Sequence, residues 1–268
     1  MLVEPAALLE AVKTVAAEAA HRIMVVYESA FEVHTKDDES PLTAADRAAH
    51  DAIVAGLKAL TPEVPVLSEE GSQLSFAERS RWARYWLVDP LDGTKEFIKR
   101  NGEFTVNIAL IEQHRPVLGV VHVPVTGECY FAARGFGAWR EAPGVAAEPI
   151  RVRRCNHTVH VVGSRSHGSP EMDVFISNLG DHAFVAVGSS LKFCRVAEGK
   201  ADLYPRLGPT SEWDTAAAQC VVEQAGGRVV TVDGAPLAYN TKASLLNPHF
   251  LVYGDLGRDW LAYLEPTV

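Results

Sequence analysis

Residues 86–94 read Trp-Leu-Val-Asp-Pro-Leu-Asp-Gly-Thr, and this stretch says most about how the chain folds. The apolar run at residues 85–88 predicts a buried strand, and two acids, Asp89 and Asp92, follow it around a Pro–Gly turn. A strand that ends in this way brings both carboxylates to one point beyond the sheet. Hard cations such as Mg²⁺ prefer oxygen ligands of this kind, completed by water and phosphate. The stretch therefore predicts a cation site at a strand end.

The same turn offers further groups that a ligand could use. It frees the backbone carbonyl of Leu91 as a neutral oxygen ligand, and Gly93 allows the chain to approach a ligand closely. The amides of Gly93 and Thr94 would open a short helix through Phe97 and are suited to holding phosphate oxygens. Taken alone, the stretch is more often an ordinary surface turn, because Asp–Gly and Asp–Pro neighbours are common turn residues.

Acids elsewhere in the chain favour the cation site over the surface turn. Glu69 and Glu70 follow the apolar run at residues 64–67, so they also stand at a predicted strand end. Asp214 lies at the start of an apolar helix predicted over residues 213–225, where the helix dipole favours an acid. Each position has a plain structural explanation, a solvated pair for the glutamates and a helix cap for Asp214. Only the combination is specific for a metal centre.

Apolar periodicity predicts alternating helices and strands in the rest of the chain. An amphipathic helix is expected over residues 8–26, and a second one after Pro41 with Thr43 as its N-cap. Apolar residues alternate with smaller or polar ones over residues 104–110, which predicts a strand in a meander. Together these elements indicate a layered α/β fold.

A change of composition suggests how the chain is divided. Residues 141–149 are rich in Ala, Pro and Gly and carry little pattern, so we place a subdomain boundary there. Residues 1–145 would form an α+β half with most of the acids. Residues 146–268, where strands and helices alternate, would form an α/β half packed against it in layers.

The composition of the 268 residues excludes several classes of protein. The formal charge of −9 argues against a nucleic-acid polymer as partner, because a polyphosphate strand would be repelled at long range. The four cysteines form no CxxC pair, and neither a signal peptide nor a transmembrane segment stands out. We expect a cytoplasmic protein with reduced thiols. Peripheral association with the cytoplasmic face of the inner membrane stays open.

The acidic segments together resemble the paired signatures of the inositol monophosphatase superfamily. Residues 69–70, 86–94 and 213–217 occur in the family's order and rough separation, and the resemblance covers nearly the whole chain. It implies the αβαβα five-layer sandwich of inositol monophosphatase and fructose-1,6-bisphosphatase, with two or three bound Mg²⁺ ions. The metal ligands that the resemblance implies are Glu69, Asp89, the carbonyl of Leu91, Asp92 and Asp214.

The resemblance also implies that the nucleophile is water rather than a side chain. Thr94 and Asp46 match the pair that orients this water, with the threonine hydroxyl bonded to the aspartate carboxylate. The simpler role for Asp46 is that of a capping-box acid for the helix at Thr43. Inhibition by Li⁺ is implied as well, through replacement of a weakly held Mg²⁺.

Three further segments look like the CysQ-type branch, the bacterial 3′(2′),5′-bisphosphate nucleotidases of sulfur metabolism: residues 36–46, 95–107 and 188–194, the last followed by residues 204–206. The branch implies a small phosphorylated nucleotide as partner, adenosine 3′,5′-bisphosphate, which loses its 3′-phosphate to give AMP. Ser189, Lys192 and Arg206 would hold the 5′-phosphate. The full set of implied substrate contacts is Gly93, Thr94, His167, Ser189, Lys192, Arg206 and Asp214.

Alternative functions stay open at this point. An inositol monophosphatase or a sugar phosphatase on the same scaffold would have less use for Ser189, Lys192 and Arg206. Aspartyl-phosphate phosphatases separate their two acids by one residue, whereas two residues separate Asp89 from Asp92. A metal-bound nucleotide sensor without catalysis would not need Thr94 and Asp46. Whether the protein is a monomer or a homodimer, and whether 3′-phosphoadenylyl sulfate is also a substrate, stays open.

Overall fold

The first two helices form because apolar residues recur every three or four positions along each of them. In the computed structural model, which describes residues 3–29, 41–71, 74–164 and 170–264, α1 spans Pro5–Tyr27 and α2 spans Pro41–Leu60. Helix α2 begins at Pro41, so the prediction of Thr43 as its N-cap is wrong. Proline suits the first turn of a helix because its φ is already helical and its missing N–H would have no partner there.

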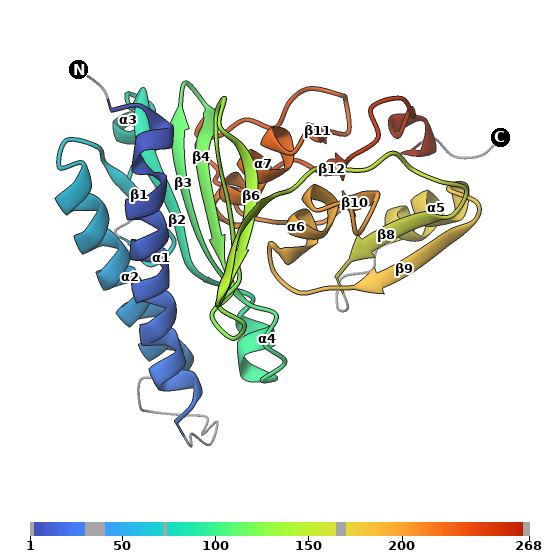
Figure 1. Cartoon of the computed structure of the whole chain (residues 1–268). Coiled ribbons are helices and arrows are strands. Elements are labelled where there is room, and N and C mark those ends of the chain that lie inside the picture. Colours follow the sequence, from blue (N-terminus) through green and yellow to red (C-terminus); the bar gives the residue numbers. More distant parts are fainter. Residues whose placement is uncertain (1–2, 30–40, 72–73, 165–169, 265–268) are drawn as a thin grey trace.

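Seven strands form the first sheet, and α1 and α2 cover one of its faces (Figure 1). The strands follow chain order, and each is antiparallel to its neighbours except that β1 is parallel to β2. Two short helices, α3 at Phe76–Arg79 and α4 at Thr94–Ile98, flank β2 in the chain. The strands are β1 Val66–Ser68, β2 Arg84–Asp92, β3 Thr105–Glu112, β4 Arg115–His122, β5 Cys129–Ala133, β6 Gly137–Ala142 and β7 Val145–Pro149.

The stretch with little sequence pattern, residues 141–149, is not irregular. It contains the end of β6, a turn and β7, which pairs with β6 at the edge of the first sheet. All five residues of β7 are exposed. A strand that buries neither face needs no alternation of apolar residues, and periodicity therefore missed it. The first sheet thus extends to Pro149, while the division into residues 1–145 and 146–268 stays a prediction.

Strand β3 is buried on both faces, although its sequence alternates. Val106 and Ile108 pack toward α1 and α2, whereas Ala109 and Ile111 pack on the opposite face. The alternation therefore marks two different apolar layers rather than a core side and a solvent side.

The second part of the chain forms a mixed five-stranded sheet in the order β11-β12-β10-β8-β9. Strand β8 is parallel to both β9 and β10, whereas β12 is antiparallel to β10 and β11. The strands are β8 Val159–Gly163, β9 His182–Ala186, β10 Leu203–Arg206, β11 Arg228–Thr231 and β12 Phe250–Tyr253. The helices are α5 Pro170–Asn178, α6 Leu191–Ala197, η1 Glu212–Asp214, α7 Ala216–Gln224 and η2 Leu261–Leu264.

Helices α6 and α7 lie between the two sheets, and α5 lies on the outer face of the second sheet (Figure 1). Helix α7 packs closely on β4 because Gly119 has no side chain: a Cβ there would lie 2.1 Å from the carbonyl oxygen of Ala217. The order of layers is helices, sheet, helices, sheet, helices, which confirms the predicted αβαβα sandwich. Among the described residues, no helix is both long and apolar enough to cross a membrane.

Candidate active site

The two acids of residues 86–94 lie on strand β2 itself. The strand continues to Asp92 with an irregularity in its pairing to β3 after Asp89, so the turn expected directly after Val88 comes only at Gly93. Gly93 has a φ of 98°, in the left-handed region that glycine adopts without strain, and α4 starts behind it as predicted. The pairing with β3 thus holds both acids at the end of the first sheet.

Three of the predicted metal ligands meet at one place. Glu69, Asp89 and Asp214 offer carboxylate oxygens that all lie within 4.8 Å of one another. The pairing of β1 with β2 brings the first two together, because the Glu69 amide donates to the Val88 carbonyl at 3.1 Å. Asp214 arrives from η1, where its carboxylate accepts a hydrogen bond from the Ser211 amide at 2.9 Å.

These carboxylates fit a hard divalent cation. Burial raises the pKa of Asp89 well above its usual range, and the charges of Asp92, Glu69 and Asp214 raise it further. The pKa of Asp214 is raised to about 7, chiefly by burial and then by the charge of Asp92. Buried carboxylates persist in proteins when a cation or hydrogen-bond donors balance them. A donor set made only of carboxylate oxygens suits a hard cation such as Mg²⁺.

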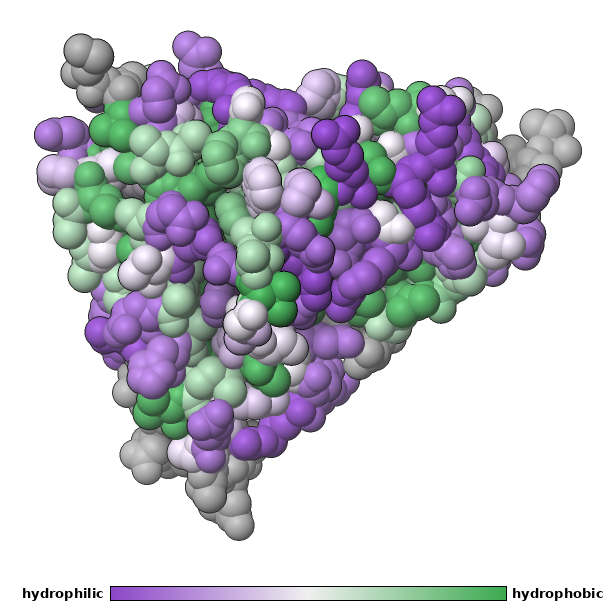
Figure 2. Space-filling view, in the orientation of Figure 1, coloured by the Kyte–Doolittle hydropathy of each residue, from purple (hydrophilic) through white to green (hydrophobic). Residues whose placement is uncertain are grey.

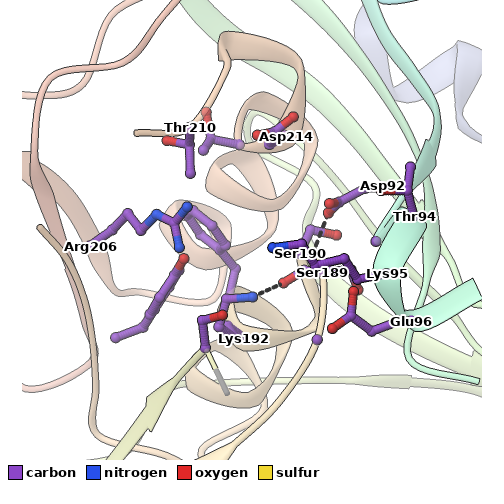
Figure 3. Close-up of a pocket in the computed structure, with 16 residues that line it drawn as sticks. Asp92, Thr94, Lys95, Glu96, Ser189, Ser190, Lys192, Arg206, Thr210 and Asp214 are labelled. Carbon is purple, nitrogen blue, oxygen red and sulfur yellow. Dashed lines mark hydrogen bonds between the residues drawn. The ribbon is translucent and has the colours of Figure 1, made fainter. Parts of the chain in front are cut away.

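Asp92 belongs to the same pocket but contacts the other half of the molecule (Figure 3). Its Oδ2 accepts hydrogen bonds from the Ser190 amide at 2.6 Å and from the Asn107 side chain at 3.3 Å. Among the described residues it does not join the group of three carboxylates. The roles of Asp92 and of the Leu91 carbonyl as metal ligands therefore stay predictions.

Asp46 and Thr94 come from two different helices, α2 and α4. Asp46 is buried, and its pKa is raised to about 8 by that burial and by the charges of Glu70 and Glu69. Thr94 is the first residue of α4 and lines the pocket. No hydrogen bond joins Thr94 to Asp46 in the part of the chain that the structure describes, and their pairing on a water stays a prediction. The capping-box role of Asp46 is excluded by its position inside α2.

A pocket of about 200 Å³ opens beside these acids and extends to the start of α6 (Figure 3). Its acidic side is formed by the end of β2 and by η1, with Lys95 of α4 beside them, and its basic side by the start of α6 and the end of β10. The predicted residues that line it are Asp92, Gly93, Thr94, Ser189, Lys192, Arg206 and Asp214.

Lys192 lies on the basic side and is only 7% exposed. Its Nζ donates to the carbonyl of Ser189 at 2.6 Å and to that of Val187 at 3.4 Å. Burial lowers its pKa to about 8, against the charge of Asp92, which raises it. Ser189 has a φ of 44°, in the left-handed region that costs free energy for a residue other than glycine. The lysine therefore holds a strained turn as well as facing the pocket.

Arg206 stands at the end of β10, on the same side of the pocket (Figure 3). Its Nη2 donates to the carbonyl of Pro209 at 2.5 Å. Thr210, one residue further on, also lines the pocket and was not predicted. His167, the remaining predicted contact, lies outside the described residues.

Sequence reasoning missed the residues that join the two halves beside the pocket. The Ser190 hydroxyl bonds to Thr105 at 2.9 Å and donates to Asn107 at 2.8 Å, and both partners are buried on β3. Glu103 accepts a hydrogen bond from the Gly188 amide at 2.9 Å. Polar Thr105 and Asn107 within an otherwise apolar strand were a signal, since buried polar groups require partners.

Comparison with known proteins places this geometry in a family. Residues 4–257 match the sequence pattern of the Inositol monophosphatase family. The chain is 53% identical over 247 residues to the 3′(2′),5′-bisphosphate nucleotidase CysQ of Salmonella typhimurium, covering 91% of this chain and 99% of that protein. The protein of the same name from Haemophilus influenzae is 36% identical over 260 residues, covering 96% and 97%.

Comparison with solved structures points to the same family. CysQ from Bacteroides thetaiotaomicron, described as a bacterial member of the inositol monophosphatase family, superimposes with a TM-score of 0.83 at 44% identity, covering 93% of this chain and 97% of that one. An inositol monophosphatase from Zymomonas mobilis gives a TM-score of 0.78 at 25% identity, covering 95% and 96%.

Proposed function

This chain belongs to the inositol monophosphatase family, and from that premise we propose that it is a 3′(2′),5′-bisphosphate nucleotidase. It removes the 3′-phosphate of adenosine 3′,5′-bisphosphate and releases AMP and phosphate. 3′-Phosphoadenylyl sulfate, which carries the same 3′-phosphate, is a second substrate. The relatives named CysQ, at up to 53% identity over nearly their whole length, support this assignment.

The observation that carries the proposal is a single pocket with two chemically different sides. A monophosphate needs only the acidic side with its cations, whereas a bisphosphate carries a second anionic group. Lys192 and Arg206 face the same pocket from the other half of the molecule. Cationic donors of this kind hold phosphate oxygens through charge-assisted hydrogen bonds.

We assign the binding of the metal ions to the acidic side of the pocket. Glu69, Asp89 and Asp214 would hold Mg²⁺ together with Asp92 and the Leu91 carbonyl, and two or three ions would bind to this set of ligands. When bound, these ions neutralise the charge of the reacting phosphate and lower the pKa of the attacking water. Li⁺ would inhibit by replacing one weakly held ion.

The protein itself positions and deprotonates the attacking water. Asp46 accepts the proton of this water, and the Thr94 hydroxyl orients it. The amides of Gly93 and Thr94 hold oxygens of the reacting phosphate. Ser189, Lys192 and Arg206 hold the 5′-phosphate. An ammonium has three donors, so the two carbonyl bonds of Lys192 leave one for a phosphate oxygen.

A phosphate-release assay tests the proposal directly. Adenosine 3′,5′-bisphosphate and inositol 1-phosphate are supplied to the purified protein, each with Mg²⁺ or with excess chelator. We expect the nucleotide to be strongly preferred and all turnover to require the metal. Preference for inositol 1-phosphate would assign the inositol monophosphatase activity instead, and tight nucleotide binding without turnover would indicate a sensor.

The proposal also covers the cellular location of the enzyme and its oligomeric state. It acts in the cytoplasm in sulfur metabolism, as a monomer or a homodimer. Light scattering at working concentration determines the oligomeric state, and fractionation of cells determines whether any of the protein associates with the inner membrane.

A further inference from the structure

A second cavity lies next to the active-site pocket, around the end of strand β8. It has a volume of about 430 Å³, within the range of about 300–1,000 Å³ that small-molecule sites occupy. Helix α5 and strand β9 form its walls, and Met172, Ile176 and Phe184 make them largely apolar. Ser164, the residue after β8, lines both this cavity and the active-site pocket, so the two lie beside each other at this residue.

Phe184 is the aromatic residue of this cavity, and the fold holds its ring at the end of β8. It pairs with Val161 across the sheet, and its ring reaches over Gly163, where a Cβ would lie only 2.5 Å from the ring atom Cζ. The absence of a side chain at Gly163 therefore makes room for the ring. Phe184 is nevertheless 47% exposed, and Figure 2 shows hydrophobic side chains on the surface where β9 lies.

The chemistry of the cavity differs from that of the neighbouring pocket. Its described lining contains no Lys or Arg, and its one histidine, His182, is hydrogen-bonded through Nδ1 to the carbonyl of Gly180. Asp173 at its edge is an acceptor that suits an exocyclic amine. A planar, uncharged, amine-bearing ring therefore fits this cavity better than a second anionic group does.

We propose that this cavity holds the adenine base of the nucleotide and that Phe184 stacks on it. The inference rests on the proposed function, because it assigns a site to the base of the same substrate, whose two phosphates already have theirs. The phosphates lie in the active-site pocket, and the nucleoside passes Ser164 around the end of β8. Exposed aromatic rings bind nucleobases in this way, because every base presents a flat face.

The test compares substrates with and without a base. Phe184→Ala should raise KM for adenosine 3′,5′-bisphosphate by about 10-fold or more, as expected for loss of base stacking, and leave kcat nearly unchanged. Hydrolysis of 2-glycerophosphate, which has no base, should not change. Phe184→Tyr keeps the ring and should restore the low KM.

Val185→Ala is the matched control. Val185 is the next residue of β9 and is 52% exposed, and because side chains alternate along a strand it faces the opposite side of the sheet. An equal rise in KM for Val185→Ala, an unchanged KM for Phe184→Ala, or an equal loss on 2-glycerophosphate would overturn the inference.

A binding measurement separates this inference from the proposed function. In Phe184→Trp, AMP should quench the added fluorescence, whereas ribose 5-phosphate should not. If the wild-type protein hydrolyses no nucleotide, the proposed function is rejected, yet the quench by AMP would still support a base site. Absence of that quench overturns the inference even if the nucleotide is hydrolysed.

Discussion

On the acidic side of the pocket, Glu69, Asp89 and Asp214 gather, and the charged neighbours that act on buried Asp89 are further carboxylates. On the basic side, Lys192 and Arg206 already donate hydrogen bonds to backbone carbonyls of their own half. The negative charges of the first group therefore lack balance within the protein, whereas the donors of the second group are partly satisfied by these hydrogen bonds.

A third group of charges shows what a complete arrangement looks like. Asp202 is fully buried, and its two oxygens accept hydrogen bonds from Arg153, each at 2.8 Å. It also accepts from the His160 amide at 2.7 Å. This acid needs no ligand, whereas Asp89, equally buried, has carboxylates as its charged neighbours and in the proposed function is balanced by a bound cation. Incomplete charge therefore indicates the functional site, and satisfied charge indicates support for the fold.

The largest effect should follow from removing the proton acceptor or the hydroxyl that orients the water. Asp46→Asn and Thr94→Ala should each lower kcat by about 10²- to 10⁴-fold, as expected for a positioned acid–base group, with little change in KM. Because both act on one water, the double variant should be little worse than the poorer single one. Additive losses would show that they act separately. Asp51→Asn, an exposed acid on the same helix, is the control.

Asp89→Asn tests whether Asp89, unlike Asp202, depends on a bound cation to balance its charge. Activity at a fixed Mg²⁺ concentration should fall by about 100-fold or more. Even the loss of a residue that only hydrogen-bonds to a metal ligand lowers metal affinity or activity by about 10- to 100-fold. In excess chelator the same variant should be more stable than wild type, because Asn needs neither to bury a charge nor to take up a proton on folding. Asp202→Asn should instead be less stable. Thermal melts of both variants in chelator measure this contrast, and a fall in stability for both would contradict it.

Substitutions on the basic side should have smaller effects and differ from one another. Arg206→Ala should lower kcat/KM for adenosine 3′,5′-bisphosphate by about 10- to 100-fold, the loss of a charged hydrogen bond, and spare inositol 1-phosphate. Lys192→Ala should reduce activity on both substrates, because it also releases the turn at Ser189. Steady-state kinetics decide between these outcomes, with Arg228→Ala, an exposed residue of the second sheet, as control. Equal losses for Arg206→Ala on both substrates would remove its role in selectivity.

The smallest effect concerns stability against pH in the absence of metal. The pKa of Asp46 rises from 3.8 to about 8 on folding, and that of Asp214 rises from 3.8 to about 7. The folded state then binds more protons than the unfolded one between about pH 4 and pH 8, so stability falls as pH rises through this window. Melting temperatures in chelator should therefore decline from pH 5 to pH 8. Saturating Mg²⁺ should flatten this decline, and a rise in its place would refute the argument.

The elements and the acids were predictable because their signals are local. Alternation over residues 104–110, the helical period of residues 8–26 and the acids at strand ends each follow from neighbouring residues. Periodicity works where an element buries one face, and it failed at β7, which buries neither. The start of α2 was misplaced because proline and the residues around it are all acceptable near a helix end.

The sequence by itself determined the layered fold, the residue types of a metal site and the family to which they point. Only the tertiary structure decided which of these side chains meet. It brings Asp214 to Glu69 and Asp89, and it places Asp92 against Ser190, 98 positions further along the chain. Contacts over such separations depend on how whole layers pack, because packing sets the distance and direction between elements. No local pattern of residues carries that information.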